Sequence, residues 1–525
     1  MGRFLLVVLA CAALAVVPAA AVAAEPPPGA AISDSLEYVK QVPSSNMIVE
    51  GKFDRVRGHK VLVTTGRYGF RTYDVSDPAD PQLLDSFQPP GILGENGYWQ
   101  DEDMELDTRR KLIIGALDPR HDDVDQTSCP GIGTSGTKNR LPGCRSGFYV
   151  ISYRDPENLR QIGDFVNLPA GHTASCIDEC RYIWTGGPAR RNDLPELFPG
   201  VWTAFTEGGR GDGRPIWVTD LRNPRKPKVF EDPIDLWRND GATDYSHDVN
   251  VDGNGIAWTS GRGGILGYAT KGFWRDPYTD RRRFARPWNP VLVAGGGLSG
   301  VNQPQTDFMH NSLRPVDGSS RASGVRRGGV LIGTEEDFTR PCDKSGRVVL
   351  SDITDSVGGE PAANSTPESP YRMQTLDTFH PAQDTPETAD PALGCSAHYF
   401  ELSGSTLGVA WYGQGLRLLD VSNARDVRQI GYYRVTATDP VANPSSNSWD
   451  LAWHGRYVYL FDMNRGIEVL KLRRGTHAAA ASRFASVTAP SVRSDPYASV
   501  PVTRGSLVCP SFKASKAARA ASQAS

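Results

Sequence analysis

Short apolar runs recur along the chain, and most of them begin with glycine and end with a polar residue. Aliphatic and β-branched side chains in such a run are typical of a strand that is buried on both faces. An Asp followed by Asp-Pro or Asn-Pro ends the strand, because the acidic side chain caps a turn and proline cannot donate to the sheet. Copies of this strand lie at residues 69–78, 147–152, 215–220, 264–268, 348–352, 415–422 and 466–470.

Each copy belongs to a longer repeat with an apolar strand before it and an outer strand after it. Six outer strands follow their copies, at residues 81–87, 159–165, 227–233, 289–295, 372–379 and 427–433. The seventh copy lacks one, but residues 36–42 (LEYVKQV) resemble the others and precede the first copy. This pattern predicts an all-β fold, a seven-bladed β-propeller whose N-terminal strand closes the last blade and so removes two sheet edges. A frayed N-terminal arm is the alternative.

The repeat resembles that of the LVIVD-repeat β-propellers and, more distantly, that of selenium-binding-protein-type propellers. The resemblance covers about residues 36–474 and rests on short, degenerate strands, so it implies a fold more than a function. The fourth copy departs most from the pattern, because no Asp follows Tyr268 and an arginine-rich insertion comes next.

The chain divides into three parts. Residues 1–24 have the form of a signal peptide, with Arg3, an apolar run at residues 4–17 and small residues at the cleavage positions. Residues 25–475 form the propeller, and the Ala/Ser/Arg-rich tail at residues 476–525 is expected to be disordered. We therefore expect a secreted or cell-surface protein, with no transmembrane segment in the mature chain; an uncleaved signal anchor is the alternative.

Charge and cysteine content limit the kinds of partner and the cellular compartment that we expect for this protein. The formal net charge of -3 gives no support to nucleic-acid binding. Export makes disulfides plausible, and no CxxC pair supports a zinc knuckle. The expected pairs are Cys129–Cys144, Cys176–Cys180 and Cys342–Cys395, with Cys509 left over. We expect a monomer whose partner is a protein or a small-molecule ligand.

Histidines stand at the start of the innermost strand in four consecutive repeats. Because innermost strands converge on the propeller axis, their first residues should crowd one mouth of the central channel. The residues at this position, or directly after it, form our candidate ligand-binding set: Glu102, Asp103, His172, His247, Asp248, His310, His398 and Asp450. In the first blade, Ser45-Asn46 is expected to take this place.

Three interpretations of this set stay open. His172, His247, His310 and His398 are candidate ligands for a divalent transition metal. They also suit a ring that hydrogen-bonds a substrate, or a purely structural ring. No HExxH spacing is present, although the resemblance to selenium-binding-type propellers implies redox chemistry at channel histidines. The acidic run Glu335-Glu336-Asp337 follows a strand; we expect a solvated turn there, and contact with the histidine ring is the alternative.

These observations support two functions. The first is an exported propeller that binds a ligand or another protein, since no nucleophile elbow or other catalytic motif is visible. The alternative is a metal-dependent enzyme, an oxidase or a hydrolase, that uses the histidine cluster at the channel mouth.

Overall fold

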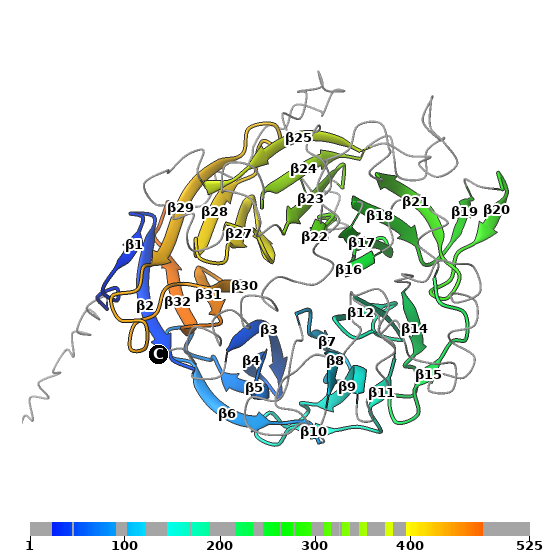
Figure 1. Cartoon of the computed structure of the whole chain (residues 1–525), viewed down its shortest axis with the longest axis horizontal. Coiled ribbons are helices and arrows are strands. Elements are labelled where there is room, and N and C mark those ends of the chain that lie inside the picture. The colour runs from blue at the N-terminus through cyan, green and yellow to red at the C-terminus, as the bar shows by residue number, and fades with distance from the viewer. Residues whose placement is uncertain are drawn as a thin grey trace, which may run out of the picture.

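The computed structural model describes residues 24–44, 47–90, 102–121, 144–168, 170–187, 216–234, 245–262, 264–276, 279–296, 309–316, 325, 328–336, 346–353, 373–381 and 395–475. In these residues, seven antiparallel sheets stand around a central axis as the blades of a propeller (Figure 1). The predicted all-β, seven-bladed fold is therefore confirmed.

Every blade is built in the same order, from the axis outward. The innermost strands are β3 (Ile48–Val56), β7 (Glu105–Asp107), β12 (Thr173–Ile177), β16 (Tyr245–Val251), β22 (Met309–Leu313), β26 (Phe400–Ser403) and β30 (Ser448–His454). The second strands are β4 (His59–Gly66), β8 (Leu112–His121), β13 (Tyr182–Gly186), β17 (Ile256–Arg262), β23 (Val330–Glu335), β27 (Thr406–Ala410) and β31 (Tyr457–Asp462).

The third strands are the recognisable repeat, and the outer strands vary more. The third strands are β5 (Gly69–Asp74), β9 (Cys144–Ser152), β14 (Trp217–Asp220), β18 (Gly264–Ala269), β24 (Val348–Asp352), β28 (Leu416–Asp420) and β32 (Gly466–Leu472). The outer strands are β6 (Gln82–Phe87), β10 (Arg160–Gln161) with β11 (Val166–Asn167), β15 (Lys228–Val229), β21 (Val291–Gly296), β25 (Gln374–Phe379), β29 (Arg428–Val435) and β2 (Leu36–Val42). The outer strands of blades two and three are thus interrupted or shorter than expected.

The acidic residue that ends the repeat strand caps a turn, as its position predicts. The side chain of Asp74 accepts a hydrogen bond from the amide of Ser76 at 2.8 Å. The same bond joins Asp420 to the amide of Ser422, also at 2.8 Å. Asp and Asn favour such local bonds over continuation of a strand, so the repeat encodes its own strand end.

The N-terminal strand β2 completes the seventh blade. It pairs antiparallel with β32 from Leu36–Leu472 to Val42–Ile467, so the first and last repeats are joined (Figure 1). Tyr38 is buried and stacks on Tyr433 of blade six, with ring centroids 5.9 Å apart. The closure is confirmed. The sequence did not indicate β1 (Ala30–Ile32), which pairs with β29 as a fifth strand of blade six.

The hydrophobic core lies between blades rather than inside any one of them. One buried cluster joins Ile114 and Val150 of blade two to Ile183 and Trp217 of blade three. Since both faces of a blade are covered by its neighbours, the repeat strands are apolar on both faces. A short hairpin of β19 (Phe273–Arg275) and β20 (Arg282–Phe284) forms a separate two-stranded sheet within the fourth-blade insertion.

Four of the innermost strands, β3, β16, β22 and β30, contain a β-bulge near their start. In each of them the pairing register skips one residue, and the skipped residues are Val49, His247, His310 and Trp449. A bulge leaves its extra residue outside the ladder and re-aims its side chain. In the first blade the equivalent position is therefore Val49-Glu50. The expected Ser45-Asn46 lies four residues earlier in the chain and outside the described residues.

The cysteine predictions are tested in part. Cys176 and Cys180 form the expected disulfide across the β12–β13 turn. Cys395 is disulfide-bonded, but its expected partner Cys342 lies outside the described residues, as do Cys129, residues 1–23 and residues 476–525. The part of the chain that the structure describes contains no helix with the length and hydropathy of a membrane span.

Ring closure predicts a large cost for Leu36→Ala. Leu36 is 2% exposed and packs between blades six and seven, so we expect a loss of about 2–4 kcal/mol in the free energy of unfolding. Leu83→Ala, on the outer strand of blade one, is the control, because Leu83 is 56% exposed. Denaturant unfolding of both variants measures the difference. Equal stabilities would show that β2 does not close the ring.

Candidate functional site

Five of the predicted residues meet at the propeller axis. Glu102 of blade two lies among the histidines of blades three to six, and its Oε2 is 3.0 Å from Nε2 of His172. The same oxygen is 3.4 Å from Nε2 of His247, 3.4 Å from Nε2 of His310 and 3.7 Å from Nε2 of His398. All five side chains are buried. Four imidazole nitrogens from four blades therefore surround one carboxylate oxygen.

Backbone carbonyls of neighbouring blades orient two of these rings. Nδ1 of His247 is 3.0 Å from the carbonyl oxygen of His310, and Nδ1 of His398 is 2.6 Å from that of Trp449. A carbonyl oxygen only accepts, so each Nδ1 donates and carries a proton. When the ring is neutral, its Nε2 then carries a lone pair that points to the axis. Such a second bond is the usual support of a metal-ligating histidine.

Burial keeps three of the four histidines neutral. It lowers the pKa of His398 to about 4. It also lowers the pKa values of His247 and His310, with neighbouring imidazoles as the next cause. Burial alone would raise the pKa of the Glu102 carboxyl, but His172 and hydrogen bonds from the other imidazoles hold it well below its usual range. At neutral pH the cluster therefore combines the anionic Glu102 with neutral rings at His247, His310 and His398.

A second carboxylate adjoins the cluster. Glu336 is buried, and its carboxylate forms a compact group with nitrogens of His310 and His398, the ligand atoms lying within 4.8 Å of one another. Tyr412 donates a hydrogen bond to Oε1 of Glu336 at 2.6 Å. The expectation of a solvated acidic turn was therefore wrong. Glu335 is also buried, in an ion pair with Arg347, and Asp337 lies outside the described residues.

Aromatic rings enclose the cluster on the side of His398. The centroids of Tyr399, Tyr412 and Trp449 lie 4.7–4.9 Å from that of His398. Tyr399 also contacts His310, with centroids 4.7 Å apart. These rings exclude water from the nitrogens, and exclusion of water strengthens electrostatic interactions within the cluster.

The remaining predicted residues form the next layer along the channel. Asp103, Asp248 and Asp450 each follow the axial residue of their blade, and all three are buried. Asp103 pairs with Lys52 at 2.9 Å, and Asp248 accepts a hydrogen bond from Asn250 at 3.0 Å. The structure thus separates the predicted set into a histidine–glutamate cluster and a layer of aspartates.

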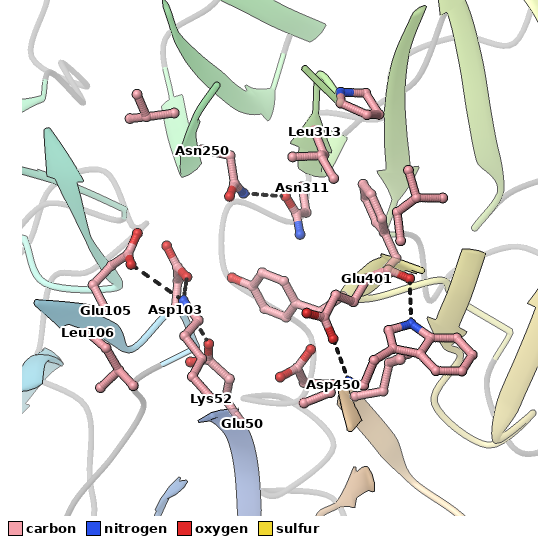
Figure 2. Close-up of a pocket in the computed structure, with 18 of the residues that line it drawn as sticks. Glu50, Lys52, Asp103, Glu105, Leu106, Asn250, Asn311, Leu313, Glu401 and Asp450 are labelled. Atoms are coloured by element: carbon pink, nitrogen blue, oxygen red, sulfur yellow. Dashed lines mark hydrogen bonds and ion pairs between the residues drawn. The ribbon is translucent and has the colours of Figure 1, made fainter. Parts of the chain in front are cut away.

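Beyond this layer the channel widens into a cavity of about 620 Å³. Figure 2 shows Lys52 among Glu50, Asp103 and Glu105, with Glu401 and Asp450 nearby. Burial would lower the pKa of Lys52, but the three carboxylates raise it well above its usual value, so Lys52 is charged. Burial also raises the pKa values of Glu105 and Glu401, each to about 7.

Our sequence reasoning missed several of these cavity residues, among them Glu50, Lys52, Asn250 and Glu401. The signal that would have found them is the alternation of a strand, in which every second side chain shares a face. Lys52 follows Glu50 by two positions, and Asn250 follows Asp248 in the same way.

Comparisons with known proteins show the fold alone. No family model matches the chain, and no curated protein is similar to it in sequence, so the resemblance to LVIVD-repeat propellers stays a prediction. A periplasmic gluconolactonase of Pseudomonas aeruginosa matches with 14% identity and a TM-score of 0.41, over 78% of this chain and 90% of its own. The C-terminal WD40 domain of Sif2 matches with 9% identity and a TM-score of 0.42, over 83% of this chain and 98% of its own.

A third match is the extracellular domain assigned to a one-component system of B. thetaiotaomicron. It has 11% identity and a TM-score of 0.43 over 83% of this chain, and this chain spans 40% of its length. Matches at these identities and TM-scores transfer no activity to this protein.

Because the aspartates of this layer are buried, we expect the free energy of unfolding to depend on pH. Burial raises the pKa of Asp450 well above its usual value, whereas an unfolded chain releases this proton near pH 4. The unfolded state therefore deprotonates first as the pH rises, and stability falls from about pH 4 upward. Asp450→Asn should raise the melting temperature relative to the parent by more at pH 8 than at pH 4.

The exposed Asp164 provides the matched control, since Asp164→Asn should shift the melting temperature little at either pH. A difference between Asp450→Asn and the parent that stays constant with pH would show that Asp450 is ionised in the folded protein.

Proposed function

We propose that this protein binds one divalent transition-metal ion at the propeller axis and acts as a metal-dependent enzyme. The observation that carries the proposal is the orientation of His398. Its Nε2 has no hydrogen-bond partner among the described residues, and its lone pair faces the anionic Glu102 at 3.7 Å, an arrangement that repels unless a cation lies between them. A divalent ion would neutralise the carboxylate and satisfy this nitrogen together.

The donor set suits such an ion. His247, His310 and Glu102 form one compact ligand group, and His310, His398 and Glu336 form another that shares His310. Among divalent ions, zinc, copper, iron and nickel are well bound by imidazole ligands. Bonds of about 2.0–2.1 Å, as zinc forms with imidazole, require the rings to close in on the axis and the Glu102 carboxylate to turn.

The identity of the ion would decide the reaction class. Zinc would supply Lewis-acid chemistry suited to hydrolysis, whereas copper or iron would supply redox chemistry suited to oxidation, as implied by the resemblance to selenium-binding-type propellers. In either case the residues of this chain would hold the ion, shield it from bulk solvent with Tyr399, Tyr412 and Trp449, and keep His247, His310 and His398 neutral.

We propose further that the protein is exported, with residues 1–24 as the signal peptide. The disulfide Cys176–Cys180 and the disulfide-bonded Cys395 support an oxidising compartment.

Elemental analysis tests the metal centre. The full-length protein, purified without chelators, should contain close to one equivalent of a transition metal, and the His247→Ala/His310→Ala double variant should contain almost none. His59→Ala is the control, because His59 is exposed and distant in the repeat from the axial position. A parent free of metal that also takes up no copper, zinc, iron or manganese would exclude the centre and, with it, the metal-dependent enzyme.

Thermal unfolding separates a metal centre from a structural ring. Ligand binding to the folded state raises the melting temperature in proportion to the logarithm of ligand concentration. Titration of metal into the metal-free parent should therefore raise its melting temperature, whereas Glu102→Gln should weaken or abolish this response. A structural ring predicts that Glu102→Gln lowers stability equally with and without added metal.

A further inference from the structure

The cavity beyond the aspartate layer is a site of its own. None of the residues that line it belongs to the histidine–glutamate cluster, and its floor includes Tyr399, Asp103 and Asp450. Its volume of about 620 Å³ lies in the range that holds small organic ligands. The chemistry of its lining decides which ligand it would recognise.

The lining carries an excess of acidic groups. Its carboxylates are Glu50, Asp103, Glu105, Asp252, Glu401 and Asp450, and its cationic side chains are Lys52 and Arg314. The two cations are already engaged: Lys52 lies 3.1 Å from Glu50 and 2.9 Å from Asp103, and Arg314 lies 3.0 Å from Asp252. Glu401 and Asp450 have no ion pair among the described residues.

A buried hydroxyl faces the same space. Tyr399 lines the cavity and is 6% exposed, and its hydroxyl has no hydrogen-bond partner among the described residues. A buried polar group left without a partner costs about 1–3 kcal/mol. This hydroxyl, on the side of the cavity where Asp248 and Asp103 lie, is available to accept a hydrogen bond from a ligand.

The spacing of the carboxylates distinguishes an organic cation from a bare ion. In the described part of the chain, both compact groups of three His, Cys, Asp or Glu side chains contain histidines of the axial cluster. Among the described residues, the cavity carboxylates thus form no group of three whose oxygens lie within 4.8 Å of one another, as a tightly held ion would need. Apolar walls that include Phe53, Phe400 and Trp453 suit a ligand with a hydrocarbon or aromatic part.

We propose that this cavity binds a small organic amine in its protonated form. Its ammonium group is held by Glu401 and Asp450, and its apolar part lies against Phe53, Phe400 and Trp453. The hydroxyl of Tyr399 accepts a further hydrogen bond from the ligand. The excess of acidic groups disfavours carboxylates and phosphates. Burial raises the pKa values of Asp450 and Glu401 in the empty cavity, so a bound ammonium would displace protons from them. The site does not require a metal at the axis.

Calorimetric titration of the metal-free, full-length protein at pH 7.5 tests this assignment. The probes are butylamine, benzylamine and 1,4-diaminobutane, with butanol and butyrate as matched compounds that lack the ammonium group. At least one amine should bind saturably and raise the melting temperature, and neither control compound should bind. Binding of calcium chloride in place of every amine would identify an inorganic cation site and overturn the proposal, as would the absence of saturable amine binding.

Variants locate the site. Glu401→Gln/Asp450→Asn should weaken amine binding by about tenfold or more, because each carboxylate makes a charge-assisted contact, and Tyr399→Phe should weaken it less. Asp164→Asn is the control. The metal content of Glu401→Gln/Asp450→Asn should equal that of the parent. The proposal of amine binding in the cavity is thus tested independently of the proposal of a metal centre at the axis. Amine binding that this double variant retains in full would place the ligand elsewhere.

Discussion

The pairing of β2 with β32 is the interaction on which the rest of the structure depends. It joins the two ends of the repeat array, so the seventh blade is complete and the apolar faces of the blades are covered by their neighbours. A closed ring also fixes the distance of every innermost strand from the axis. The meeting of side chains from different blades is therefore a consequence of ring closure rather than of any local sequence motif.

Convergence on the axis concentrates charge where solvation is poor. Glu102, Asp103, Asp248 and Asp450 are buried within two adjacent layers, and Lys52 is the cation that faces them from the cavity side. Such an arrangement lowers the stability of the empty protein, since the burial of charged groups costs free energy that their partners repay only in part. Proteins tolerate this cost at functional sites, which is the physical reason for assigning ligands to both layers.

The blade count and strand order followed from the sequence because the repeat strand and its terminal Asp act locally. The axial histidines were found in the same way, since one residue per repeat occupies a fixed place in the strand. Features that depend on contact between distant segments were not predictable: the burial of Glu336 beside His398, the addition of β1 to blade six, and the cavity. The first-blade position at Val49 was missed because the bulged residue there is apolar, so nothing distinguishes it from its apolar neighbours Met47 and Ile48.

The β-bulge in the innermost strands affects which side chains the blades can place at the axis. The skipped residue has no paired residue on the neighbouring strand, so the side chain at this place is not constrained by a cross-strand partner. Valine, histidine and tryptophan all occupy this place in different blades, and the pairing continues on either side. The chemistry at the axis can therefore differ from blade to blade while the strands around it keep their pairing.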